Sequence, residues 1–266
     1  MAAEYFAGID IGSITAKCVI ITNGGIASKS IMPTGVGGPE VARKVVQNAL
    51  EGIGKTWDNI AHIVATGYGR ISVPFECKKV TEITCHGRGV YHLFPAARLV
   101  VDIGGQDSKV IKLDNKGQVI DFVMNDKCAA GTGRFLEVIA NAMQVEISQL
   151  GNLSLQSANV VDISSTCTVF AESEVVSLVA RGTPRVDIIA GVHRAIASRV
   201  YGMVKGKLDE GIQGDIIMTG GVAKNTGVLR ALAEKLGRNI LVPEEPQYTG
   251  ALGAAIISQR QAGKTS

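Results

Sequence analysis

The chain has 266 residues, of which 46% are hydrophobic and 19% are charged, and its formal net charge is +3. This composition is typical of a globular protein, and the small charge gives no reason to expect nucleic acid or an anionic membrane as a partner. The sequence contains no apolar run of roughly eighteen residues, so we expect no membrane span. The N-terminal segment MAAEYFAGIDIG lacks the pattern of an export signal, and we therefore expect a cytoplasmic protein.

The first predicted elements are a strand, a polar turn and a second strand in residues 8–21, GIDIGSITAKCVII. Their apolar flanks are rich in β-branched residues, which favours strands. A helix is expected at residues 39–54. Residues 100–113, VVDIGGQDSKVIKL, repeat the first pattern of a strand, Asp-Ile-Gly, a polar turn, a lysine and a strand. An internal repeat of this kind predicts two related lobes.

Helices and strands alternate in the rest of the chain. We expect helices at residues 131–143, 168–181 and 187–208, and then a strand at 215–219 that leads through Gly220 and Gly221 to a helix starting near Lys224. This order predicts an α/β fold with mixed sheets. We place the first lobe at residues 1–94 and the second at 95–248, and we expect the last helix, about 249–260, to pack back on the first lobe.

The two Asp-Ile-Gly turns suit a polyphosphate ligand. Gly12 lets the backbone come close to a ligand, and Lys17 can reach it as a point charge. The N–H groups between them can donate to phosphate oxygens, and they belong to Ser13, Ile14, Thr15 and Ala16. Asp10 and Asp102 are candidate ligands of Mg²⁺, most simply through water. A single turn needs no ligand, but its repetition, together with Gly220-Gly221, predicts that the protein binds a nucleotide, which the resemblances given below imply to be ATP or ADP.

The order DIGSITAK, TEITCHG, DIGGQDSK and MTGGVAKN resembles the actin, Hsp70 and sugar-kinase superfold. This resemblance implies a ribonuclease H-like fold of two lobes with duplicated mixed sheets and a nucleotide cleft between them. It makes residues 10–17 the first phosphate motif, residues 102–106 with Gly104 and Gly105 the second, and Gly220 and Gly221 the adenosine motif. It also implies that Glu82 positions the attacking water or the water of the metal. Gln106 stands where the superfold has a third glycine, so its amide can reach toward the terminal phosphate. The alternative for Glu82 is a solvated carboxylate at a helix start.

Two of the five cysteines, Cys128 and Cys167, each lie just before an expected helix. A helix N-terminus favours the thiolate form of a nearby cysteine. Zinc and iron–sulfur clusters need four such ligands, so one chain supplies half a set and a two-fold dimer would complete it. From spacing alone a redox disulfide and two inert buried thiols remain open. The odd cysteine count without an export signal argues against a disulfide scaffold, and no pair of cysteines has the CxxC spacing of a zinc knuckle.

The segments NDKCAAGTGRF and SSTCTVFAESEV, with ATGYGR and DIIAGVHRAIASRV, resemble the ATP-dependent activators of 2-hydroxyacyl-CoA dehydratases and the ATPase subunits of benzoyl-CoA reductase. This resemblance covers essentially the whole chain. It implies a homodimer that holds one [4Fe–4S] cluster between its subunits through Cys128 and Cys167 of each. It further implies that ferredoxin or flavodoxin donates an electron, and that ATP hydrolysis drives this electron into the dehydratase.

Three more residues are candidates for holding the nucleoside: Gly133 in the turn after Cys128, Asn225 after the adenosine motif, and Gln247. Because the same helix would begin at the nucleotide and lie beside the cluster, lobe closure is expected to change the surroundings of the cluster. Two other functions remain alternatives. One is a small-molecule kinase of the same superfold, which would give the two cysteines no role. The other is a nucleotide or redox sensor built on the same cluster.

Overall fold

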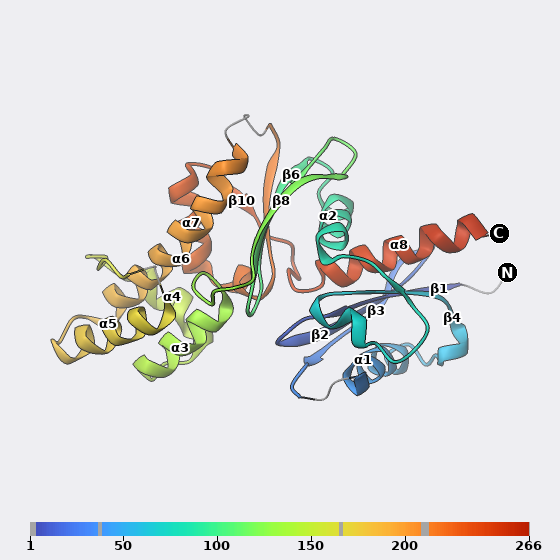
Figure 1. Cartoon of the computed structure of the whole chain (residues 1–266), viewed down its shortest axis with the longest axis horizontal. Helices are drawn as coiled ribbons and strands as arrows, with labels where there is room; N and C mark the ends of the chain where they lie inside the picture. Colours follow the sequence, from blue (N-terminus) through green and yellow to red (C-terminus); the bar gives the residue numbers. More distant parts are fainter. Residues whose placement is uncertain (1–3, 37–38, 165–166, 209–212, 266) are drawn as a thin grey trace. The chain divides into compact units, whose positions relative to one another are not determined.

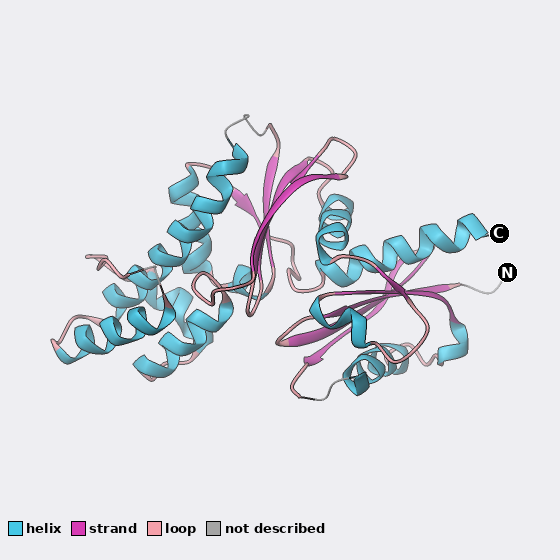
Figure 2. Cartoon of the chain, viewed as in Figure 1, coloured by secondary structure: helices cyan, strands magenta, loops and turns pink. Residues whose placement is uncertain are grey.

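The computed structural model of the chain describes residues 4–36, 39–164, 167–208 and 213–265 (Figure 1). It divides into two compact units. The first comprises Met1–Val100, Leu113–Asp121 and Gln247–Ser266, and the second comprises Val101–Lys112 and Phe122–Pro246. Each unit is built on one five-stranded sheet. The strands are magenta in Figure 2.

The first unit has the sheet order β3-β2-β1-β4-β5. Strands β1 and β2 pair antiparallel, as do β2 and β3, whereas β4 runs parallel to β1 and to β5, so the sheet is mixed as expected. The elements are β1 (Tyr5–Ile11), β2 (Thr15–Thr22), β3 (Gly25–Pro33), α1 (Pro39–Glu51), η1 (Trp57–Asn59), β4 (Ile60–Thr66), η2 (Tyr68–Ser72), β5 (Lys78–Lys79), α2 (Glu82–Leu93) and α8 (Thr249–Thr265).

The central strands of this sheet are apolar on both faces because a helix covers each face. Ile9 and Ile20 belong to the core that packs with α1, whereas Phe6 and Val19 belong to the core that packs with α8. Helix α8 can lie directly on β1 because residue 8 is a glycine. A Cβ at Gly8 would lie 2.1 Å from a carbonyl oxygen of α8.

The second unit holds most of the other sheet, whose order is β10-β9-β6-β7-β8. Ala97–Val100 of β6, Leu113 of β7 and Val119–Asp121 of β8 are grouped with the first unit. The elements of this sheet and of the second unit are β6 (Ala97–Ile103), β7 (Ser108–Leu113), β8 (Val119–Asn125), α3 (Gly133–Met143), η3 (Ile147–Gln149), α4 (Leu150–Ser154), α5 (Thr168–Ala180), α6 (Arg185–Leu208), β9 (Asp215–Thr219), η4 (Gly221–Lys224), α7 (Thr226–Leu236) and β10 (Ile240–Leu241). Strand β6 is a near-continuous buried run, as expected for a central strand.

The predicted helices are all present, and some of their ends are shifted for local reasons. Helix α3 begins at Gly133 rather than at residue 131, because Thr132 has the extended backbone of an N-cap. The helix expected to start near Lys224 starts at Thr226, because Asn225 accepts hydrogen bonds from the backbone of its first turn. Helix α8 continues to Thr265, beyond the expected end near residue 260.

Candidate functional site

The first Asp-Ile-Gly turn joins β1 to β2 and holds a buried ion pair. Asp10, at the end of β1, is 5% exposed and lies opposite Lys17 in the strand pairing. The Lys17 Nζ lies 3.3 Å from Asp10 Oδ2. The turn is closed by the Gly12 N–H, which donates to the Thr15 carbonyl at 3.1 Å. This geometry places a carboxylate and an ammonium group at the base of one glycine turn.

The second Asp-Ile-Gly turn, between β6 and β7, repeats this geometry residue for residue. Lys109 Nζ lies 3.4 Å from Asp102 Oδ2, and both side chains are almost completely buried. The Gly104 N–H donates to the Asp107 carbonyl at 2.9 Å. The second turn also has the Asp107 carboxylate, 2.8 Å from the same lysine. Sequence analysis quoted Lys109 only as part of the repeat, yet its ammonium is the counter-ion of Asp102.

The internal repeat extends to a third element that the sequence analysis did not find. Strand β4 ends in Thr66-Gly67 and β9 ends in Thr219-Gly220, and each pair is followed by a 3-10 helix. The two glycines have φ values of 84° and 85°. If residue 67 had a Cβ, this atom would lie 2.4 Å from Asp10 Oδ1. If residue 220 had one, it would lie 2.3 Å from the Ile103 carbonyl oxygen. Only glycine fits such a left-handed position against another backbone. The segments ATGYGR and MTGGVAKN are therefore structural counterparts.

Charged groups of α2 and η2 gather near the first turn. Glu82 is the first residue of α2, with Thr81 as its N-cap. Burial raises the pKa of the Cys85 thiol to about 12, and the charges of Asp10, Arg70 and Glu82 all act on this thiol. These three groups therefore lie around one buried position in the first unit.

Helix α8 also begins beside Asp10. A Cβ at Gly250 would lie 3.2 Å from Asp10 Oδ2 and 3.0 Å from His86 Nε2. The other ring nitrogen of His86 lies 3.2 Å from Thr249 Oγ1. The last helix was expected to pack on the first lobe, but no local pattern links His86 or Gly250 to this turn.

Helix α3 is joined directly to the second turn. The N–H groups of its first residues, Gly133 and Arg134, donate to the carbonyl oxygens of Gly104 and Gly105 at 2.9 and 2.8 Å. Gly133 also lies next to the adenosine motif, since a Cβ on residue 133 would be 3.6 Å from Val222 Cγ2. The second phosphate motif, the start of α3 and the adenosine motif therefore meet in the second unit. The Gly133 N–H, which we expected near a nucleoside, is used within the chain.

Gly220 anchors the adenosine motif, since its N–H donates to the Pro246 carbonyl at 3.0 Å. The side-chain oxygen of Asn225 accepts from two N–H groups of α7 at 3.0 Å each. Its Nδ2 lies 3.2 Å from His193 Nε2.

Gln106 is exposed in the second turn, so its amide is free to turn. Gln247 starts the segment that belongs to the first unit.

The two candidate cluster ligands lie beside helices that pack together. Cys167 is the N-cap of α5, and Cys128 lies in the loop before α3, where its carbonyl accepts from Asn125 Nδ2 at 2.9 Å. Helices α3 and α5 are in contact. Both thiols are free and partly exposed, while Cys18 and Cys85 are buried. Ser165 and Thr166, which precede Cys167, lie outside the described residues.

A complete metal site is not present within the described part of this chain. No group of three or more histidine, cysteine or acidic side chains gathers there in a way that could hold a metal ion. Two partly exposed cysteines before packed helices fit half of a four-thiolate set, since such clusters need four ligands. Within the same residues, no helix is long and apolar enough to cross a membrane.

Two sheets with duplicated Asp-Ile-Gly and Thr-Gly turns define the actin and sugar-kinase class of nucleotide-binding folds. In agreement, a ROK family glucokinase from Streptomyces griseus has a similar fold, with a TM-score of 0.56 at 14% identity over 96% of this chain and 99% of that one. Residues 7–258 match the BadF/BadG/BcrA/BcrD ATPase family, and the chain belongs to this family. The expected fold class and the family resemblance are therefore confirmed.

Two relatives are much more similar. The (R)-2-hydroxyglutaryl-CoA dehydratase activating ATPase of Acidaminococcus fermentans is 47% identical over 262 residues, which is 98% of this chain and 99% of that protein. The solved structure of the activator of the 2-hydroxyisocaproyl-CoA dehydratase from Clostridium difficile, with bound ADPNP, has a TM-score of 0.92 at 45% identity. The match covers 98% of this chain and 96% of that one.

Proposed function

We propose that this protein is an ATP-hydrolysing iron–sulfur activator that passes single electrons from ferredoxin or flavodoxin to a 2-hydroxyacyl-CoA dehydratase or a related acyl-CoA reductase. The observation that carries the proposal is the junction in the second unit. There, the first N–H groups of α3 bind the second phosphate turn, and Cys128 lies in the loop that enters the same helix. One of the two relatives is named as the activating ATPase of a 2-hydroxyacyl-CoA dehydratase and the other as the activator of such an enzyme. These names support a dehydratase as the partner.

The two ion pairs contain the lysines and carboxylates that would bind the phosphates and the magnesium ion of a nucleotide. Each carboxylate, Asp10 and Asp102, already has a lysine within 3.4 Å. With ATP bound, Lys17 and Lys109 would turn toward phosphate oxygens, and the two carboxylates would hold the water shell of Mg²⁺. Glu82 or Gln106 would orient the attacking water. The backbone of residues 12–16 would donate to the phosphates, as in other glycine turns.

An exposed apolar surface supports a homodimer that shares a cluster. Val169, Phe170 and Val176 of α5 are 64%, 66% and 52% exposed, and α5 begins next to Cys167. Such a group of exposed large side chains is typical of a surface that a protein partner covers. Two chains would bring four thiolates, the full set for one [4Fe–4S] cluster. When bound, this cluster would supply a one-electron carrier.

The chain's own residues suggest how the nucleotide would act on the cysteines. A shift of the turn at Gly104 and Gly105 pulls on α3 through two backbone hydrogen bonds. Helix α3 packs on α5, so a movement of α3 reaches both cysteine segments. The potential of a cluster depends on solvent exposure and on hydrogen bonds to sulfur. We therefore propose that ATP changes the surroundings of the cysteines through α3.

The first test is the iron and sulfide content of protein purified without oxygen. We expect about two irons per chain, one four-iron cluster for two chains, and a brown colour that Cys128→Ser and Cys167→Ser each abolish. Cys77→Ser is the matched control, because Cys77 is also partly exposed but packs against the core of the first unit. It should keep the colour.

Two results would redirect the assignment. A colourless, iron-free protein that still hydrolyses ATP would overturn the activator and favour the small-molecule kinase. A protein with the cluster that delivers no electron to a purified dehydratase, with reduced ferredoxin and ATP present, would favour the sensor. Both assays use the full chain, and ATP hydrolysis reports in each case that the nucleotide site is intact.

A further inference from the structure

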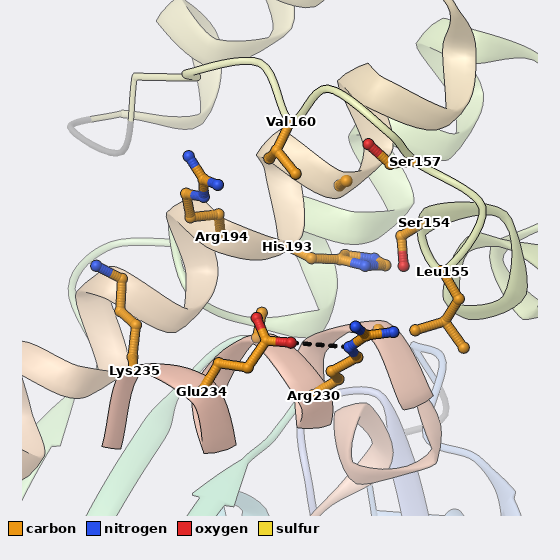
Figure 3. Close-up of a pocket in the computed structure, with 12 residues that line it drawn as sticks. Ser154, Leu155, Ser157, Val160, His193, Arg194, Arg230, Glu234 and Lys235 are labelled. Atoms are coloured by element: carbon orange, nitrogen blue, oxygen red, sulfur yellow. Dashed lines mark hydrogen bonds and ion pairs between the residues drawn. The ribbon is translucent and has the colours of Figure 1, made fainter. Parts of the chain in front are cut away.

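A cavity in the second unit is lined by residues of α6 and α7. Its volume is about 450 Å³, within the range of small-molecule sites. The end of α4 and the loop that follows close one side (Figure 3). The lining residues include Ser154, Leu155, Val160, His193, Arg194 and Arg230. None of them belongs to the phosphate turns or to the adenosine motif.

His193 presents an unused hydrogen-bond donor to this cavity. The side-chain oxygen of Asn225 accepts two backbone N–H groups, so its Nδ2 must be the donor toward His193 Nε2. His193 Nε2 is then the acceptor, and the proton of the neutral ring is on Nδ1. The side chain is 1% exposed, and Nδ1 has no hydrogen-bond partner among the residues that the structure describes. An unpaired buried donor is costly, which points to a ligand that it binds.

The close packing around Nδ1 requires a glycine at position 227. A Cβ at Gly227 would lie 2.3 Å from His193 Nδ1 and 2.1 Å from Ser154 Oγ, so only glycine fits here. The Ser154 hydroxyl donates to the Gly151 carbonyl at 2.8 Å, which leaves its lone pairs free. Figure 3 shows the imidazole of His193 and the hydroxyl of Ser154 pointing toward one another at one end of the cavity.

The rim of the cavity is positively charged. It carries the cations Arg194, Arg230 and Lys235 and one anion, Glu234. Arg230 Nε lies 2.8 Å from Glu234 Oε1 and Arg194 lies 3.4 Å from Asp162, but these side chains are 49% to 97% exposed. Exposed pairs of this kind contribute at most about 1 kcal/mol. Both guanidinium groups can therefore turn toward a ligand, and guanidinium forks match carboxylate and phosphate groups.

One wall of the cavity is held in place and the rest is partly apolar. Asp187 of α6 accepts from the Ser157 hydroxyl at 2.7 Å and from the Asn159 N–H at 3.2 Å. These bonds fix the loop after α4 against α6. Leu155 and Val160 of this loop line the cavity beside the charged rim. The site therefore combines a buried donor, two guanidinium groups and a short apolar wall.

We propose that this cavity is a binding site for a small organic oxyanion, a phosphate or carboxylate group carried on a short apolar body. The oxyanion lies between Arg194 and Arg230 at the rim. One acceptor atom reaches the Nδ1–H of His193, and the apolar body lies against Leu155 and Val160. The site is separate from the phosphate turns that the nucleotide would occupy.

The test follows the four histidine rings of the full chain by ¹⁵N NMR. The protein is first saturated with ADP and Mg²⁺, so that added anions cannot enter the nucleotide site. Inorganic phosphate and butyrate are then titrated separately. We expect the Nδ1 signal of His193, protonated at the start, to shift saturably, while the other three rings stay unchanged. A response to phosphate alone or to butyrate alone identifies which oxyanion the site takes.

Calorimetry on rim variants provides the second measurement. Arg194→Ala and Arg230→Ala should each weaken anion binding by about tenfold, the loss of one charge-assisted hydrogen bond. Both positions are exposed, so the variants should fold. Arg185→Ala, at the exposed start of α6, is the matched control and should bind as the parent does. No saturable shift with either anion, unchanged affinity in both rim variants, or the same His193 shift caused by ADP alone would overturn the proposal.

Discussion

Thr219→Val should destabilise the second unit by removing one buried hydrogen bond. The Thr219 hydroxyl donates to Asp102 Oδ1 at 2.8 Å, and the two side chains are 0% and 3% exposed. Valine has nearly the same shape, so the change removes the donor and leaves little cavity. A hydrogen bond to a charged group contributes about 1.5–3 kcal/mol, and no water can replace it in a buried position. We expect a loss of this size in the free energy of unfolding.

Urea unfolding followed by circular dichroism measures this change, and calorimetry should show the melting temperature lower by roughly 3–10 °C. Thr66→Val is the control, because Thr66 is the counterpart of Thr219 in the first unit and is equally buried. No hydrogen bond joins its hydroxyl to Asp10, so its replacement should cost much less. Equal losses in the two variants, or a Thr219→Val protein as stable as the parent, would show that the bond to Asp102 is not the cause.

Three further outcomes are expected. Gly220→Ala should lower the free energy of unfolding by more than about 2 kcal/mol, since it combines a left-handed φ with a backbone clash, whereas Gly24→Ala in an open turn should not. Burial lowers the pKa of His193 from 6.5 to about 4, so the unfolded chain binds a proton that the folded chain does not. The free energy of unfolding should therefore fall as the pH drops from 6.5 toward 4. The fall should be roughly 3 kcal/mol larger in the parent than in His193→Gln, and urea titrations at several pH values measure it. Burial also raises the pKa of Cys18 and Cys85 to about 12, so mass spectrometry should find both unmodified by iodoacetamide until the protein unfolds.

The sequence predicted those parts of the fold that rest on local pattern. Asp-Ile-Gly between two β-branched runs predicts a strand, a turn and a strand, and its repetition predicts a duplicated architecture. The residues from Asp10 to Lys17 can be recognised for this reason. Helix ends were less accurate, because they depend on single capping residues such as Asn225.

Other parts of the site depend on contacts between residues far apart in the chain. The segments around Thr66-Gly67 and Thr219-Gly220 have only the Thr-Gly dipeptide in common. Their equivalence is seen only in the structure, where each pair packs against its Asp-Ile-Gly turn. The unused donor of His193 depends on how Asn225 is hydrogen bonded, which no spacing in the sequence encodes. The sequence by itself determined the turn chemistry and the family, because these lie in short contiguous motifs. The tertiary structure alone decided which buried polar groups are paired, because pairing depends on where separate strands and helices meet.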